Sequence, residues 1–224
     1  MRNALSIVIP VGPDDTAWQG LLPELASVDA ADIALVCPGE RPADPVPLTD
    51  KRLLLVIAPT GRACQQNAGA AVTTAPWLWF LHADSRFAPE TLLRLREFIA
   101  RNESVVGYFD LRFAGDGPRW TQLNALGARL RSSWFGLPFG DQGLLMPRRV
   151  FEALSGFDES VASGEDHALV WRAKRAGIPV RPVGAPLFTS ARKYAQQGWW
   201  RTTRHHLRLT CAQAWAFSRA ERAR

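Results

Sequence analysis

WLWFLHADS, residues 77–85, is the stretch of this sequence that decides the fold. Its first six residues, Trp77–His82, are almost entirely apolar or aromatic, which is typical of a strand buried on both faces of a sheet. Asp84 follows at the carboxyl end of that strand, where open α/β sheets bind their ligands. A carboxylate in this place is suited to hold Mg²⁺ or Mn²⁺ beside a phosphate. It is equally suited to close a turn or cap the next helix, and residue spacing alone leaves both interpretations open.

Similar buried runs precede this stretch, and helical segments alternate with them. The strands predicted before it are residues 5–11, 33–37 and 53–58, and the predicted helices are residues 16–27, 62–74 and 89–101. The proline-rich segment 38–47 reads as a loop. The resulting order, β-α-β-β-α-β-α, indicates an α/β fold with an open, mainly parallel sheet flanked by helices.

The second half of the chain has shorter elements and a glycine-rich loop at residues 136–143. Strands are predicted at residues 105–113, 144–146 and 178–183, and helices at residues 120–133, 148–154, 164–176 and 198–224. We see neither an internal repeat nor a linker. We therefore expect one domain, residues 1–197, with a basic, aromatic C-terminal helical extension at residues 198–224.

The composition is that of an ordinary globular protein. The 224 residues are 47% hydrophobic and 21% charged, so a sizeable core is available. The three cysteines, Cys37, Cys64 and Cys211, are far apart, which argues against a zinc site or a disulfide framework. The sequence contains no signal-peptide pattern and no apolar run of membrane-spanning length. We expect a cytoplasmic protein.

Most of the net charge of +6 comes from the C-terminal end. From Arg192 onward there are eight Arg or Lys residues and one acid, Glu221. Together with Trp199, Trp200 and other aromatic residues, these arginines predict a helix that contacts the inner face of an anionic membrane. An ordinary helix docked on the domain is the alternative. Nucleic-acid binding is disfavoured, because the charge is local and no nucleic-acid-binding motif accompanies it.

Three further segments carry residue types suited to chemistry. Glu165-Asp166 opens a predicted helix, where Asp166 is a candidate general base or else only stabilises the helix dipole. Gly140-Asp141-Gln142 is a flexible polar segment suited to sugar hydroxyls, or a simple turn. Arg62 at the start of a helix could bind a diphosphate, or it is an ordinary surface arginine.

The order of several motifs resembles glycosyltransferase family 2, whose members have the GT-A fold. The motifs are SIVIP, GRACQQNAGA, WLWFLHADS, GDQGLLM and GFDES…GEDHALVWRAKRAG, in that order. The sequence is most similar to a bacterial subgroup with GRA-x-Q-x-NAGA, LHADS or LHADT, GDQ and TSAR motifs. The resemblance extends from Ser6 to about Thr203. It implies an inverting transferase that moves a sugar from a nucleotide-sugar donor to the hydroxyl of a sugar or lipid-linked acceptor.

The resemblance also implies roles for individual residues. Asp84 would bind a divalent metal, Mn²⁺ or Mg²⁺, that bridges the donor diphosphate, and Asp166 would be the catalytic base. The nucleotide sugar would contact Pro10, Val11, Arg62 and Asp84, and the acceptor and donor sugars would contact Gly140, Asp141, Gln142 and Glu165. His82 occupies the place of the earlier acid in the metal-binding motif, and its own part in metal binding stays open.

One departure from the family pattern concerns the nucleotide. The family places an acid at the end of its second strand, where this sequence has Cys37, and Glu40 could replace that acid if its loop folds back. This departure motivates an alternative function, a catalytically silent glycosyltransferase-like binding protein. A third possibility, a nucleotidyltransferase, requires a basic glycine-rich loop after the first strand, where the sequence instead has acidic Asp14 and Asp15.

Overall fold

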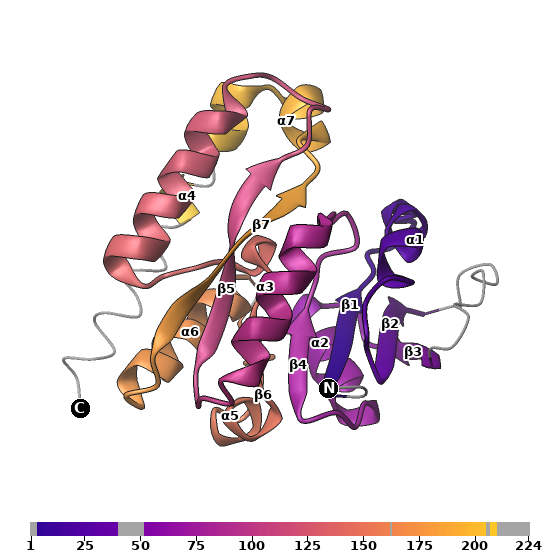
Figure 1. Ribbon diagram of the computed structural model, residues 1–224. Coiled ribbons are helices and arrows are strands. Elements are labelled where there is room, and N and C mark those ends of the chain that lie inside the picture. Colours follow the sequence, from indigo (N-terminus) through magenta and orange to yellow (C-terminus); the bar gives the residue numbers. More distant parts are fainter. Residues whose placement is uncertain (1–3, 40–51, 162, 205–206, 210–224) are drawn as a thin grey trace.

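The computed structural model describes residues 4–39, 52–161, 163–204 and 207–209, and a seven-stranded sheet forms its centre (Figure 1). The strands are β1 (Leu5–Pro10), β2 (Asp32–Pro38), β3 (Arg52–Ala58), β4 (Trp77–Phe80), β5 (Val106–Phe113), β6 (Leu145–Pro147) and β7 (Val180–Thr189). Their order across the sheet is β3-β2-β1-β4-β6-β5-β7. β1 to β4 are parallel, β6 is antiparallel to both of its neighbours, and β7 is parallel to β5. The predicted open, mainly parallel α/β sheet is confirmed.

Helices cover both faces of the sheet. They are η1 (Ala17–Gly20), α1 (Leu22–Leu25), α2 (Arg62–Val72), α3 (Pro89–Ala100), α4 (Thr121–Phe135), η2 (Gly140–Gln142), α5 (Arg148–Ala153), α6 (Glu165–Arg175) and α7 (Arg192–Gln197). Successive strand side chains point to opposite faces, so Ile7 and Ile9 enter the core under η1, α1 and α3. Val8 enters the second core, under α2, α5 and α6.

The small residues of α2 bring this helix close to the sheet. A Cβ atom added to Gly69 would lie 2.5 Å from Cγ1 of Val8 and 2.9 Å from Cγ2 of Val36. A larger side chain would therefore push the helix away from β1 and β2. This close packing fixes the start of α2, and with it Arg62, beside the carboxyl end of β1.

Two predicted elements differ from the structure. The helix expected at residues 16–27 is two short pieces, η1 and α1. The side chain of Asp15 accepts a hydrogen bond from the N–H of Ala17 at the start of η1, and Pro23 favours the start of a new helix because it lies in the first turn of α1. The last strand continues from Val180 to Thr189 rather than ending at residue 183. It contains Pro182 and Pro186, which an edge strand tolerates because one side of its backbone needs no partner strand.

The C-terminal extension is described only in part. Residues 199–204 and 207–209 are helical, whereas the rest of the predicted helix lies outside the described residues. A separate short helix, α7, precedes it and was not predicted. None of the helices in the described part of the chain has the length and apolar character needed to cross a membrane.

Candidate active site

The carboxyl ends of β1 and β4 form one side of the site. The two strands are parallel neighbours, and the chain leaves β4 through a turn at His82–Ser85 in which the N–H of Ser85 donates to the carbonyl of His82. The hydroxyl of Thr189 donates a hydrogen bond to Oδ1 of Asp84 at 3.4 Å. Burial raises the pKa of Asp84, and the guanidinium of Arg192 acts in the opposite direction.

The second side of the site is built by η2 and the start of α6. Gly164 precedes α6 in the left-handed conformation, with φ of +83°, so the chain turns sharply and buries both Glu165 and Asp166. One carboxylate oxygen of Asp166 accepts the N–H of Gly140. The other accepts the N–H of His167 at 2.9 Å. Asp166 is thus a carboxylate held in a fixed orientation by two backbone donors.

Gly140 is the point where the two sides meet. A Cβ atom added to Gly140 would lie 2.5 Å from Oδ2 of Asp166 and 3.1 Å from Nε2 of His82. The end of β4 and the start of α6 therefore approach the same glycine, although they are distant in the sequence. Any side chain at this position would displace Asp166, which gives a physical reason for glycine here.

Asp141 lies between the charged groups of both sides. Its Oδ1 atom is buried and has no hydrogen-bond partner among the described residues. Burial raises the pKa of Asp141 to about 6; the charges of Asp166 and Asp84 act in the same direction, whereas Arg131 and Arg62 act to lower it. Asp84 and Asp166 therefore both act on one carboxyl group, which places the two predicted acids around a shared centre.

Three arginines supply positive charge around these acids. Arg62, at the start of α2, is about half exposed, and its Nη1 lies 3.4 Å from Oε1 of the buried Glu165. Arg192, at the start of α7, lies 3.4 Å from Oδ1 of Asp15. Arg131, from α4, packs over the ring of Phe139 with its Cζ 3.6 Å from the ring centroid. Acids alternating with partly exposed cations are an arrangement suited to a ligand that carries both phosphate and hydroxyl groups.

His82 is an uncharged member of the site. Burial and the nearby charge of Arg62 lower the pKa of His82 to about 3, so the imidazole is neutral near pH 7. Within the described part of the chain its Nε2 atom is buried without a hydrogen-bond partner. A neutral imidazole with an unpaired nitrogen facing Gly140 and Asp166 can bind a hydroxyl group or a metal ion.

Several predicted contacts have protein partners already. The N–H of Val11 donates to the carbonyl of Val36, and its carbonyl accepts from the side chain of Gln65. Pro10 is buried at the end of β1 in register with Val36. Nucleobase binding by Pro10 and Val11 through the backbone stays a prediction, and these partners leave little of that backbone free for it.

Gln142 has a clear structural role. Its side chain is fully buried, and its Oε1 atom accepts hydrogen bonds from Arg131, Ser132 and the N–H of Phe139. Its Nε2 atom donates to the carbonyl of Phe109 at 3.1 Å. Gln142 thereby ties η2 to α4 and β5, and so holds Gly140 and Asp141 in place. Direct sugar binding by Gln142 stays a prediction.

Cys37 does not present a polar group to this site. It is buried at the end of β2 within the core under η1 and α1, and this burial raises the pKa of its thiol. Glu40, the predicted substitute, lies outside the described residues. The acid that the family places here therefore has no counterpart in the part of β2 that the structure describes.

Sequence reasoning assigned no role to Arg131, Arg192 or Tyr194, although all three border the site. The charge of Arg131 acts on Asp141 and Asp166. Tyr194 is buried in α7, and burial together with the charge of Asp141 raises its pKa to about 12. The TSAR motif contains Arg192 and could have drawn attention to α7. The sequence around Arg131, by contrast, does not distinguish it from an ordinary surface arginine.

The residues present can hold a metal ion only together with a bound ligand such as a phosphate. The described residues include no group of three or more His, Cys, Asp or Glu side chains placed to hold an ion. Asp84 is one carboxylate at a strand end, with the unpaired atoms of His82 and Asp141 at the same site. This donor set fits Mg²⁺ or Mn²⁺ only where a bound phosphate supplies further oxygens, which is a common arrangement for such ions.

Part of the chain matches a known protein family. Residues 50–154 match the family described as "Glycosyl transferase family 2". The matched part contains α2, β4, Asp84 and η2 but ends before α6, so it does not include Asp166. No curated protein matches the chain in sequence.

The fold is shared with solved structures of TarS from S. aureus. The crystal structure of TarS 1-349 has a TM-score of 0.57 and 15% identity, over 83% of this chain and 60% of that one. TarS 1-349 in complex with UDP-GlcNAc has a TM-score of 0.58 and 14% identity, over 83% of this chain and 58% of that one. This chain thus spans less than two thirds of those structures, and at such low identity the likeness shows the α/β fold of the GT-A type. This chain is therefore similar to glycosyltransferase family 2 over residues 50–154, and it shares its fold with the TarS structures.

Proposed function

We propose that this protein is a glycosyltransferase that moves a sugar from a nucleotide-sugar donor to an acceptor hydroxyl. The observation that carries the proposal is the convergence of Asp84, Asp141 and Asp166 with Arg62 around the carboxyl end of β4. The family match and the fold support the same reaction class. The TarS structures named for UDP-GlcNAc and UDP support a nucleotide sugar as the donor.

In this proposal the donor diphosphate lies between α2 and the end of β4. Arg62 is half exposed at the start of α2, so its guanidinium and the free N–H groups of that helix start can bind phosphate oxygens. Arg192 adds a second positive charge beside Asp84. A divalent cation held by Asp84 and the diphosphate would add positive charge that stabilises the leaving group.

Asp166 is the proposed catalytic base. The acceptor hydroxyl gives its proton to an Asp166 oxygen while the hydroxyl oxygen bonds to the anomeric carbon. The bond from that carbon to the diphosphate breaks with its electron pair, so a nucleoside diphosphate leaves and the anomeric configuration inverts. Each Asp166 oxygen already accepts one backbone N–H, and each retains a second lone pair for the substrate.

The remaining predicted residues surround the transferred sugar in this proposal. Asp141 has an unpaired oxygen within the described site and can accept a hydrogen bond from a sugar hydroxyl. Glu165 orients Arg62 through their ion pair. Gly140 leaves the space that a sugar and Asp166 both need. In this proposal the acceptor is a sugar or a lipid-linked molecule, and the reaction takes place in the cytoplasm at the inner face of the membrane.

A second candidate function is a glycosyltransferase-like binding protein without catalysis. The position of Cys37 favours it, because the nucleotide-binding acid expected at the end of β2 is replaced by a buried thiol. This candidate keeps the phosphate-binding arginines but loses a contact that helps to select and hold the nucleotide.

A ligand screen separates the two functions. We expect one or more nucleotide sugars to raise the thermal unfolding temperature in the presence of Mn²⁺, and calorimetry to give a Kd for that donor and for its free nucleotide. Incubation with the donor and candidate acceptors should then release nucleoside diphosphate. Donor binding without release, across sugar and lipid-linked acceptors, would favour the binding protein. A lack of binding to every common nucleotide sugar would refute the proposed reaction.

A further inference from the structure

Helix α4 has its large apolar residues on the outside. The side chains that it buries are small or polar, namely Thr121, Ala128 and Ser132. Those that face away from the protein are large, with relative exposures of 53% for Leu123, 52% for Leu126, 39% for Leu130 and 75% for Trp134. The spacing of these four residues places them in one stripe along the helix.

The preceding helix in the sequence, α3, shows the usual arrangement. It buries Leu92, Leu95, Phe98 and Ile99, and of its large apolar side chains only Leu93 is well exposed. An isolated exposed leucine needs no explanation, whereas a continuous stripe of leucine and tryptophan does. The exposed face of α4 therefore suits contact with an apolar environment outside the described protein.

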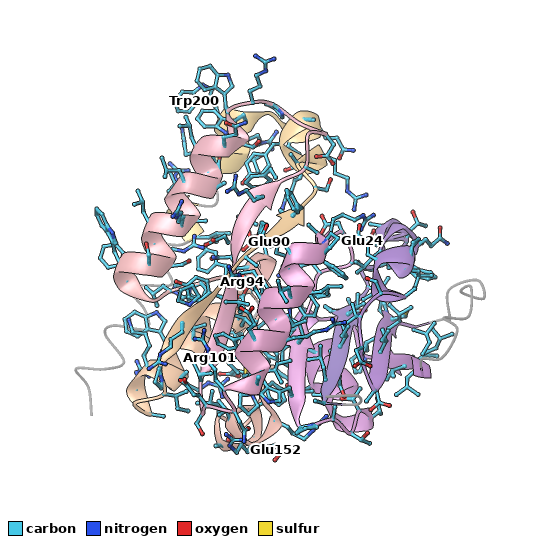
Figure 2. All side chains as sticks on the ribbon, viewed as in Figure 1. Glu24, Glu90, Arg94, Arg101, Glu152 and Trp200 are labelled. Carbon is cyan, nitrogen blue, oxygen red and sulfur yellow. The ribbon has the colours of Figure 1, made fainter. Side chains whose placement is uncertain are left out.

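The start of the C-terminal helix extends this surface. The indole N–H of Trp199 donates to Oδ1 of Asn124 at 2.6 Å, and Asn124 donates to the hydroxyl of Thr203 at 3.0 Å. These bonds attach residues 199–204 to α4. Trp200, which is 78% exposed, lies at the outer tip of the molecule near one end of α4 (Figure 2).

The two segments that carry these residues are positively charged. The sequence contains no acid between Gly117 and Gly140, nor between Ala191 and Ala220. An open hollow of about 780 Å³ lies next to Trp200, and its described lining includes Arg201, Arg204 and Arg208. Exposed Arg119 and Arg129 add charge at α4. An apolar stripe bordered by arginines and lacking acids is complementary to an anionic lipid surface.

We propose that the outer face of α4, together with the start of the C-terminal helix, docks on an anionic membrane. The leucines and tryptophans would enter the boundary between headgroups and acyl chains, and the arginines would bind lipid phosphates. A second copy of this chain fits less well, because a symmetric contact would bring two basic surfaces together. Nucleic acid fits less well too, because it offers no apolar phase for Leu123, Leu126 and Leu130.

Docking in this orientation would place the candidate active site near the lipid surface. Arg131 leaves the inner side of α4 and acts on Asp141 and Asp166, whereas its neighbour Leu130 lies on the outer stripe. One helix therefore connects the proposed membrane surface to the site. The docking itself does not depend on the proposed transferase activity, since it can be measured by binding alone.

The test uses the full chain and sedimentation with vesicles. We expect binding to vesicles of equimolar phosphatidylglycerol and phosphatidylcholine, weaker binding to phosphatidylcholine alone, and partial release by salt. The double variant Leu126→Ser/Leu130→Ser should weaken binding to the mixed vesicles by roughly tenfold or more, because it removes two inserted side chains. The variant Arg201→Glu/Arg204→Glu should abolish the preference for anionic lipid.

Matched controls come from α3. Leu93→Ser removes an equally exposed leucine, and Arg96→Glu reverses an exposed arginine; neither should change vesicle binding. Circular dichroism and light scattering check that every variant keeps its fold and association state. Unchanged binding by the leucine double variant would overturn the proposal. So would absence of vesicle binding by the unaltered chain, dimerisation through α4, or stronger binding to RNA than to anionic vesicles.

Discussion

The two halves of the sheet contribute different kinds of group to the candidate site. The parallel half, β1 to β4, supplies Arg62 and Asp84, which are partly exposed and stand at the ends of regular elements. The second half supplies Glu165 and Asp166, which are buried, and Asp141, whose Oδ1 atom is buried; Asp166 is also held by two backbone N–H groups. Partly exposed groups can adapt to a ligand, whereas buried and fixed groups are oriented before the ligand arrives.

This difference suggests a division of work between the halves. We expect the parallel half to determine how strongly the donor binds, because Arg62 and Asp84 border the place proposed for the diphosphate. We expect the second half to determine the rate of transfer, because its fixed carboxylates face the incoming hydroxyl. The first two variants below test that division, and the third tests whether burial raises the pKa of Asp141.

Asp166→Asn should have the largest effect. The amide keeps the size of the side chain but cannot accept a proton, so the transfer rate should fall by roughly 100-fold to 10,000-fold. Donor affinity, measured by calorimetry, should stay close to that of the unaltered protein. The control is Asp29→Asn, which alters an exposed acid far from the site. Equal transfer rates for Asp166→Asn and the control would remove Asp166 from the role of base.

Asp84→Ala should have an intermediate effect, and mainly on binding. Loss of the carboxylate should weaken Mn²⁺-dependent donor binding by roughly tenfold or more, since the proposed metal ligand would be removed. Calorimetry with and without Mn²⁺ measures the difference, and the affinity without metal should be similar in both proteins. If Asp84→Ala left the metal-dependent affinity intact, the expectation that the parallel half determines donor affinity would be refuted.

Asp141→Asn should have the smallest effect, and on stability. Burial raises the pKa of Asp141 to about 6 in the folded protein, above its ordinary value of 3.8. The folded state therefore binds the proton more tightly than the unfolded state, so ionisation of Asp141 lowers stability as the pH rises through this interval. Above about pH 6 the variant should be more stable by about 1–3 kcal/mol, and this advantage should vanish near pH 4.

Urea unfolding of both proteins across this pH range measures the difference. The buried His82, with a pKa of about 3, has the opposite slope, because the unfolded state binds its proton more tightly. That contribution is common to both proteins and cancels in the comparison. If the difference in unfolding free energy between the two proteins stayed constant from pH 4 to pH 7, burial would not raise the pKa of Asp141.

Much of the framework could be predicted from local patterns. The buried runs of β1 to β4 and the helices α2, α3 and α6 were identified because their apolar periodicity is strong. The prediction was wrong at the last strand: it was expected to end at residue 183, yet β7 continues through Pro186 to Thr189 at the edge of the sheet. Whether a proline is tolerated depends on which side of the strand has a neighbour.

The outward face of α4 shows the same limit. Leu123, Leu126 and Leu130 in a helical pattern predict a buried face, because apolar stripes normally face a core. In the structure Ala128 and Ser132 are buried instead, and the leucines are exposed. The direction of a helix face is set by long-range packing, which the local pattern does not contain.

By itself the sequence determined most of the strands and long helices and the residue types available for chemistry, because these follow from periodicity and side-chain structure within a few residues. Only the tertiary structure decided that Asp166 and His82 meet at Gly140, and that Asp84 and Asp166 both act on Asp141. It also decided that Cys37 faces the core and that the buried side chain of Gln142 makes its hydrogen bonds to other protein groups. The physical reason is that strand order and helix orientation minimise the free energy of the whole packed chain, so distances between remote side chains are fixed only once every element is in place.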